Sequence, residues 1–244
     1  MISPLFTTIV LTFGFIWIYM KITTKGVEKE SEKYMEREIR ANKVRKQSLD
    51  SLEYITIPMD QIPQPADYPN DRIRELTEVL QDLSSKTIVN LTGISNTDLK
   101  LMYGAPNLPI LTEYDQNYTT LCTTIYDLGC EYLNSDLKVT AIKVLNVGID
   151  LGTDISGNYL VLADIYASDG EYSQIQRLVT CAQNIRSLTK DSTISKLLDI
   201  LDSHTSSVTK LGDDGNPTED TDNILPQDIL DILETVPYTS GDQK

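Results

Sequence analysis

The sequence has few of the residues on which catalysis and metal binding usually depend. Its 244 residues include one histidine and three cysteines, so no site rests on two imidazoles, and the cysteines fit neither a zinc spacing nor a disulfide framework. Motifs for phosphate loops, dinucleotide loops, zinc proteases and nucleophile elbows are absent from it. We therefore expect no enzymatic activity, no catalytic residues, no cofactor and no metal site.

Basic residues are also in deficit. The chain has 21 Lys and Arg against 36 Asp and Glu, which gives a net charge of −15. Nucleic-acid binding needs a basic face, so the composition argues against a nucleic-acid partner. Apolar residues make up 40% of the chain, which is enough for a packed core. Recognition of a protein or peptide partner is the role that remains.

Charged side chains are missing altogether from residues 1–20, MISPLFTTIVLTFGFIWIYM. About 20 apolar residues in a helix cross the hydrocarbon core of a membrane, and Trp17 and Tyr19 suit its interface. A cleaved signal peptide would need a basic start and a small-residue cleavage site, and the segment has neither. Residues 1–20 are therefore predicted to form a transmembrane helix.

The next segment, 21–50, is basic at its start. Between 21 and 46 nine Lys or Arg accompany five Glu, whereas no Lys or Arg precedes residue 21. By the positive-inside rule, we expect a single-pass protein of the cell membrane with its C-terminal body in the cytoplasm. The alternative is the inverted orientation, with an extracytoplasmic body. The alternating charges predict a juxtamembrane helix over 21–50 that is solvated, contacts anionic lipid or forms a short dimerising coil.

A linker and a helical body follow. The segment 51–69 contains four prolines, which exclude a long helix and predict a linker that docks on the body through Ile55, Ile57, Met59 and Ile62. The body is expected over 70–204. It starts with a helix over 71–84, capped by Asn70 or Asp71, whose apolar face is Ile73, Leu76, Val79, Leu80 and Leu83. A short helix over 96–103, capped by Ser95 or Asn96, ends at Gly104.

The segment 115–204 matches itself when it is shifted so that Ile125 aligns with Tyr159. The same shift superimposes aromatic or large apolar residues on one another and small residues on small ones: Leu128 on Leu162, Gly129 on Ala163, Tyr132 on Tyr166, Leu145 on Val179 and Gly148 on Ala182. This pattern resembles the tetratricopeptide repeat, a helix–turn–helix unit of about 34 residues. The resemblance implies an all-α fold of two degenerate repeats with capping helices, behind the N-terminal transmembrane helix. A generic helical bundle is the alternative.

The two units depart from the repeat pattern at several positions. Asp136 stands where the first unit should have its turn glycine, whereas the second unit has Gly170 there. Ile175 replaces the preferred Ala, and neither unit ends in the usual Pro. A terminal capping helix is predicted over 191–204, with an apolar face of Ile194, Leu197, Leu198 and Leu201. Residues 205–244 are predicted to be an acidic tail whose short amphipathic segment, 224–233, docks on a partner or folds back.

The resemblance also implies a binding groove lined by the front helix of each unit. The positions left free by packing are eight candidate peptide-binding residues: Tyr126, Cys130, Leu133, Asn134, Leu160, Asp164, Ala167 and Ser168. None of them is basic, so the groove suits an apolar or basic peptide. The structural alternative is that these residues pack on the chain's own linker.

These observations together predict a membrane-anchored protein–protein interaction adaptor without catalytic activity. A structural or assembly subunit of a membrane complex, in which the transmembrane helix makes the specific contact, is one alternative. An anchored interaction domain outside the cytoplasm is the other. The oligomeric state and the partner's identity stay open.

Overall fold

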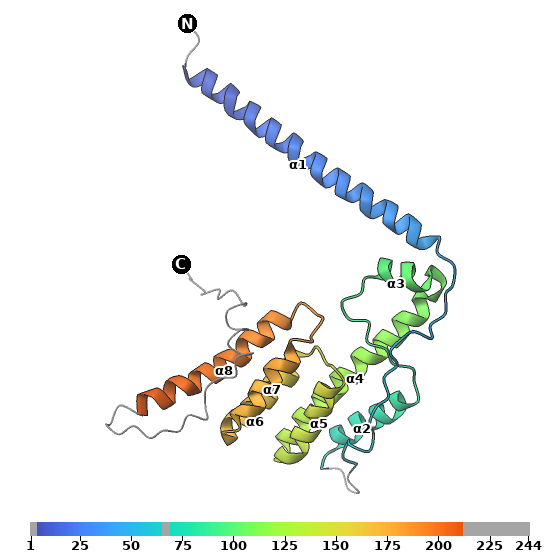
Figure 1. Ribbon diagram of the computed structural model, residues 1–244, viewed down its shortest axis with the longest axis vertical. Helices are drawn as coiled ribbons and strands as arrows, with labels where there is room; N and C mark the ends of the chain where they lie inside the picture. The colour runs from blue at the N-terminus through green and yellow to red at the C-terminus, as the bar shows by residue number, and fades with distance from the viewer. Residues whose placement is uncertain (1–3, 65–68, 212–244) are drawn as a thin grey trace. The chain divides into compact units, whose positions relative to one another are not determined.

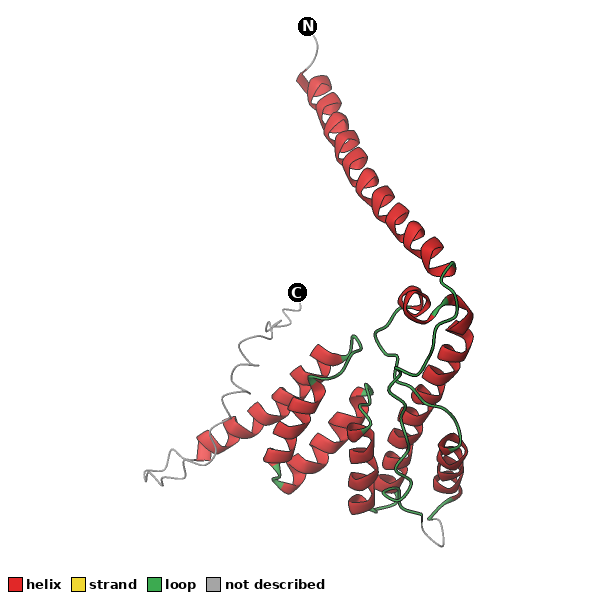
Figure 2. Cartoon of the chain, turned by 45° about the vertical axis from the view of Figure 1, so that its right-hand side comes forward, coloured by secondary structure: helices red, strands yellow, loops and turns green. Residues whose placement is uncertain are grey.

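A computed structural model describes the backbone of residues 4–64 and 69–211 and the side chains of residues 12–17, 19–21, 29–64 and 69–203. Within these ranges every regular element is a helix (Figure 2). The one β-type pairing found in them is an isolated antiparallel bridge between Tyr54 and Val89. The prediction of an all-α fold is therefore confirmed. His204 and the amphipathic segment 224–233 lie outside the described side chains.

The chain divides into two compact units. The first comprises Met1–Leu52 and Ile94–Thr112, and the second comprises Glu53–Gly93 and Glu113–Lys244. Because the first unit is made of two separate stretches of sequence, it depends on contacts between the N-terminal segment and the short helix near residue 100. The domain boundaries drawn from the sequence stay a prediction.

The first unit is dominated by α1, a single helix of 39 residues over Pro4–Asn42 (Figure 1). At 1.5 Å per residue it is about 58 Å long, and it has no break between the uncharged and the charged stretch. It ends at Asn42, so the predicted helix over 21–50 extends too far.

Among the described residues, no helix is both long and apolar enough to cross a membrane. The structure does not describe residues 1–3 of the predicted span, nor the side chains of residues 4–11 and 18.

The C-terminal turns of α1 pack against α3 (Asn96–Tyr103). Ala41 of α1 is fully buried. Glu38 accepts a hydrogen bond from the Thr97 hydroxyl at 2.7 Å and forms an ion pair with Lys100. We call this contact the α1–α3 clamp. The end of the charged helix is therefore docked, and the expectation that the whole of it is solvated is wrong for these turns.

Backbone contacts extend the clamp past the end of α1. Helix α3 begins after the capping hydroxyl of Ser95 and ends at Gly104, as predicted. Gly104 has a φ of 89°, and a Cβ built on it would lie 2.2 Å from the backbone oxygen of Arg45. Glycine therefore suits this position for two reasons, the positive φ and the close approach of the Arg45 backbone. The amide of Gln47 donates to the carbonyl of Tyr103 at 2.9 Å, which ties the chain after α1 to the end of α3.

We predict that the α1–α3 clamp weakens in acid. Hydrogen bonds from Lys100 and Thr97 lower the pKa of Glu38 below its usual 4.5. The ionised form thus stabilises the contact above pH 4.5, and that contribution is lost as the pH falls through the lowered pKa. NMR spectra of the α3 amides recorded from pH 6 to pH 3 should show this titration, and Glu38→Gln should abolish it. The exposed neighbour provides the control, since Glu36→Gln should leave the titration in place.

The second unit consists of helical hairpins lying side by side (Figure 1). The first hairpin pairs α4, from Glu113 onward, with α5, and the second pairs α6 with α7. Helix α2 accompanies the first, and α8 packs on both helices of the second. Their bounds are Asp71–Ser84 for α2, Leu108–Asn134 for α4, Lys138–Asp150 for α5, Ser156–Asp169 for α6, Tyr172–Ala182 for α7 and Lys190–Leu211 for α8.

The helices repeat at the interval that the sequence predicts. Helix α5 begins at Lys138 and α7 at Tyr172, and the same interval separates the starts of α6 and α8. The turns between the paired helices also match, because Asp136 and Gly170 both have left-handed backbones, with φ of 58° and 76°. In each turn an amide donates back to a tyrosine carbonyl at 2.9 Å, from Leu137 in the first and from Glu171 in the second. The two hairpins therefore share their helix spacing and turn geometry, which is compatible with a helical-repeat fold.

Small residues let the helices approach closely. A Cβ built on Gly129 would lie 2.5 Å from the Cγ of Leu145, which is fully buried on α5. A Cβ on Gly148 would lie 2.9 Å from the Oδ1 of Asn158 on α6 and 3.1 Å from Ile125 on α4. Gly129 thus fixes the contact within the first hairpin, and Gly148 fixes the contact between the first hairpin and the second.

Two apolar clusters fill the second unit. The cluster of the first hairpin includes the α2 residues Ile73, Leu76, Leu80 and Leu83, with Ile57 and Ile62 of the linker buried beside them. Ile55 and Met59 pack on its edge, so the predicted docking of the linker is confirmed. On α2, Val79 is 39% exposed and Thr77 is buried instead. The buried hydroxyl of Thr77 is satisfied, because it donates to the carbonyl of Ile73. The cluster of the second hairpin includes the four predicted residues of α8: Ile194, Leu197, Leu198 and Leu201.

Two buried tyrosines hold the connection between the hairpins. The hydroxyl of Tyr118 on α4 donates to the carbonyl of Gly152 at 2.6 Å, and that of Tyr159 on α6 donates to the carbonyl of Thr153 at 3.0 Å. Burial raises the pKa of both phenols well above 10, so both stay protonated as donors. One tyrosine from each hairpin therefore anchors the same short loop.

We predict that Gly129→Ala destabilises the chain by about 1–3 kcal/mol, the usual cost of overpacking a core. The added methyl group collides with Leu145, so a double-mutant cycle with Leu145→Ala identifies the cause. Leu145→Ala alone should also destabilise the chain. In the Leu145→Ala background, adding Gly129→Ala should cause almost no further loss of stability. The measurement is thermal unfolding of the purified chain followed by circular dichroism.

Gly14→Ala is the matched control, because a Cβ at Gly14 meets nothing within 4 Å. If Gly129→Ala lowered the stability equally in the wild type and in Leu145→Ala, the close approach of α4 and α5 would be contradicted.

Candidate functional site

A pocket of about 310 Å³ lies where the first hairpin meets the second. Its lining comes from the end of α4, the start of α5 and one face of α6: Leu133, Lys138, Val161, Asp164, Ile165 and Ser168. We call it the inter-hairpin pocket. Its volume is at the lower end of the roughly 300–1,000 Å³ range of ligand-binding clefts.

The pocket has apolar walls and a polar rim. Leu133, Val161 and Ile165 supply the apolar surface, and Ile165 is buried. On the rim, the Ser168 hydroxyl donates to the carbonyl of Ile165 at 2.7 Å, which leaves its oxygen able to accept a hydrogen bond. Asp164 is exposed on the same helix. The arrangement suits an apolar group that enters the pocket with polar contacts around it.

The two carboxylates of α6, Asp164 and Asp169, differ in their partners. Lys138 forms an ion pair with Asp169, which directly follows Ser168. For Asp164 no ion pair with any described Lys or Arg is found. The charge of Lys138 is therefore already compensated within the chain, whereas the charge of Asp164 is not.

The structure separates the eight candidate peptide-binding residues into three groups. Leu133, Asp164 and Ser168 line the inter-hairpin pocket. Tyr126, Leu160 and Ala167 pack against the apolar cluster of the second hairpin. Cys130 is half-buried and Asn134 is exposed, and neither lines the pocket. Whether the first three bind a peptide stays a prediction.

Tyr126 packs against the second hairpin. A Cβ built on Gly157 of α6 would lie 2.8 Å from the phenol ring of Tyr126, so the ring rests directly on the α6 backbone. A side-chain hydrogen bond with Cys130, together with burial, raises the pKa of Tyr126. Tyr126 is therefore half-buried at the contact between the two hairpins.

Sequence reasoning missed three lining residues: Lys138, Val161 and Ile165. The signal for two of them was present on α6. Val161, Asp164, Ile165 and Ser168 follow the i, i+3, i+4, i+7 spacing of one helix face, next to the predicted face that starts at Leu160. Lys138 begins α5 just after the turn at Asp136, and no pattern in its neighbours indicates that it faces α6.

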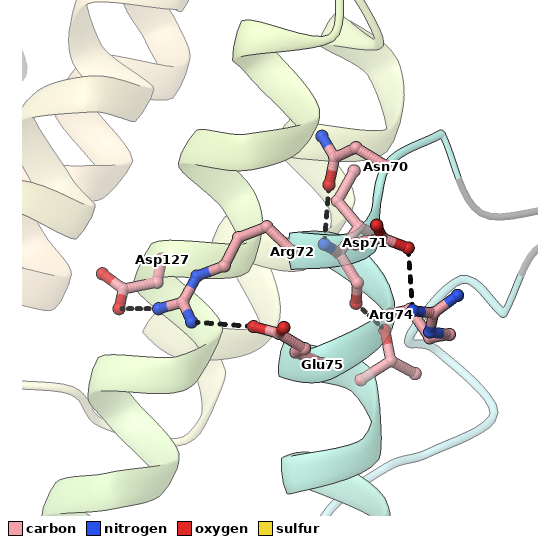
Figure 3. Close-up of polar contacts among 8 residues, drawn as sticks. Asn70, Asp71, Arg72, Arg74, Glu75 and Asp127 are labelled. Carbon is pink, nitrogen blue, oxygen red and sulfur yellow. Dashed lines mark hydrogen bonds and ion pairs between the residues drawn. The ribbon is translucent and has the colours of Figure 1, made fainter.

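On the first hairpin, the surface equivalent to the pocket side of α6 is covered by another helix. Asp127 of α4 aligns with Val161 of α6 under the repeat shift, and the guanidinium of Arg72 on α2 lies 3.9 Å from the Asp127 carboxylate. Figure 3 shows Arg72 between Asp127 and Glu75, to which it also donates at 3.3 Å. Helix α2 begins at its Asn70 cap, which accepts from the amide of Ile73 (Figure 3) and donates to the hydroxyl of Ser135 just after α4 at 3.3 Å. The side of α4 that corresponds to the pocket side of α6 is therefore covered by α2.

The groups that line the pocket are suited to non-covalent contacts. Within the described part of the chain no group of three His, Cys, Asp or Glu is placed to hold a metal ion. The lining offers aliphatic surface, the carboxylate of Asp164, the ammonium group of Lys138 and the hydroxyl of Ser168.

Comparison with known proteins returns nothing similar: no protein-family model matches the sequence, and no curated protein and no solved structure resembles it significantly.

We predict that the three cysteines react with a maleimide in the order of their exposure. Cys122 is buried, whereas Cys130 and Cys181 are half-buried. In the folded chain at pH 7.5, Cys130 and Cys181 should be modified, and Cys122 only after unfolding. Burial raises the pKa of Cys130 above its usual 9.0, so its rate should keep rising above pH 9.

Mass spectrometry of the digested protein assigns each modified cysteine, and Cys130→Ser provides the control. Equal rates for Cys122 and Cys130 would contradict the placement of α4.

Proposed function

We propose that the chain is a non-enzymatic, membrane-anchored adaptor that binds a protein partner in the inter-hairpin pocket. One observation carries the proposal. The pocket lies between the front helices of two structurally equivalent hairpins, where the walls are aliphatic and the rim is polar. Such a concavity can bury an apolar side chain of a partner while the rim makes polar contacts.

The proposal includes a tetratricopeptide-like character for the body. It is supported by the shared spacing of the helix starts, by the matching left-handed turns and by the small residue at Gly129. In such repeats the front helices line the binding surface. The three predicted residues that line the pocket, Leu133, Asp164 and Ser168, come from α4 and α6, which are those front helices.

The membrane anchor in the proposal rests on the sequence. Residues 1–20 carry no charge, and the nine Lys or Arg that follow up to residue 46 favour a cytoplasmic body. The continuity of α1 from Pro4 to Asn42 supports a rigid connection from this segment to the α1–α3 clamp.

A second candidate is an assembly subunit that uses α1 for its specific contact. The observation in its favour is a set of exposed large apolar side chains on the uncharged part of α1: Phe13, Phe15, Ile16 and Trp17. In that case, replacing residues 2–20 by an unrelated anchor would abolish function. The adaptor proposal expects function to survive the replacement.

The test compares two tryptophan substitutions at exposed serines. Ser168→Trp places a large ring on the pocket rim, and Ser173→Trp makes the same change on α7, away from the lining. Tagged chains are cross-linked in intact cells of the source, purified from membranes and analysed by mass spectrometry. The wild type and Ser173→Trp should capture the same proteins, and Ser168→Trp should lose them.

The result that would contradict the adaptor proposal is an unchanged set of captured proteins with Ser168→Trp. Carbonate extraction of the same membranes tests the anchor separately, because a chain that spans the bilayer stays in the pellet.

A further inference from the structure

We infer that the inter-hairpin pocket takes a basic peptide segment, in which a large aliphatic side chain enters the pocket and a neighbouring Lys or Arg pairs with Asp164. This inference rests on the proposed function and specifies the chemistry of its ligand. It follows from three properties of the site: the charge of its two front helices, the pairing of Lys138 with Asp169, and the position of Asp164 on α6.

The two front helices that flank the pocket carry charges of one sign. Residues 113–134 of α4 contain four Asp or Glu, α6 contains two, and neither stretch contains a Lys or Arg. A surface with charges of one sign attracts ligands of the opposite sign and repels its own. Anionic lipid and nucleic acid are therefore disfavoured as occupants, and a basic peptide is favoured.

Asp164 is the one carboxylate among the residues that line the pocket. Arg72 lies beside Asp127, and Lys138 of the pocket lining pairs with Asp169. Asp164 lines the pocket and forms no ion pair with the Lys and Arg of the described segments. Its side chain is exposed, so a cation reaches it without entering the core.

The position of Asp164 fixes the spacing between anchor and charge. Val161 and Ile165 lie one turn or less from Asp164 on the same helix face, and Ser168 follows one turn later. An aliphatic side chain held between Leu133 and Ile165 therefore brings the adjacent residues of its peptide over Asp164. The hydroxyl of Ser168 is placed to accept a hydrogen bond from the same ligand.

The test selects ligands from a displayed library of random dodecapeptides. The full chain in detergent is the target, with the variants Asp164→Lys, Ser168→Trp and Asp199→Lys. Asp199 is exposed on α8 and lies outside the pocket lining, so its reversal is the matched charge control. Affinities of the selected peptides are then measured by fluorescence anisotropy at low and at high salt.

The expected result is enrichment of Lys or Arg within a few residues of Leu, Ile or Met. Asp164→Lys should weaken these peptides about tenfold, and selection on this variant should favour Asp or Glu instead. Asp199→Lys should bind like the wild type, and higher salt should weaken the wild-type complexes.

Ser168→Trp identifies the peptides that bind in the pocket, because it abolishes their binding. If these peptides show no preference for basic residues, the inference is overturned and the proposed function stays intact. Absence of any peptide sensitive to Ser168→Trp would overturn both. A synthetic peptide of residues 25–46 is included because it is the basic segment of the chain itself. Its capture in the pocket would make a second copy the occupant and would overturn the assignment to a separate partner.

Discussion

The close packing of α4 on α5 at Gly129 is the contact on which the second unit depends. A single helical hairpin has an apolar face that it cannot bury alone, so it needs a neighbour on each side. The absence of a side chain at Gly129 lets Leu145 sit fully buried in the first hairpin. The closely packed pair that results is covered by α2 and the linker on one side and by α6 on the other. Helix α8 covers the second hairpin in turn.

The inter-hairpin pocket is a consequence of this stacking. Equivalent positions on α4 and α6 have different neighbours, since Asp127 meets Arg72 of α2 whereas Val161 faces the pocket. The described part of the chain therefore has two hairpins with matching turns and an apolar pocket between them. Under the proposed function recognition is concentrated there, and the uncompensated charge of Asp164 gives that surface a sign.

Local signals predicted the elements well, and contacts between distant residues decided what they missed. Ser95 and Gly104 fixed both ends of α3, and the repeat shift located the hairpins, because caps and periodicity act within a few residues. The docking of α3 on the end of α1 depends on Glu38 meeting Lys100, far along the chain, and no local pattern encodes that. Within the site, the predicted residues of α6 coincide with the lining only at Asp164 and Ser168, because which face borders the pocket depends on how α6 packs against α4 and α5.

Hydrogen exchange tests most directly whether the hairpins depend on one another. Amide protection is measured along α5, α6 and α7 in the wild type and in Gly129→Ala. If each hairpin is stable only against its neighbour, the loosening caused at Gly129 should spread, and the amides of α6 should lose protection together with those of α5. Unchanged protection in α6 and α7, with loss confined to α4 and α5, would show independent hairpins and contradict the account.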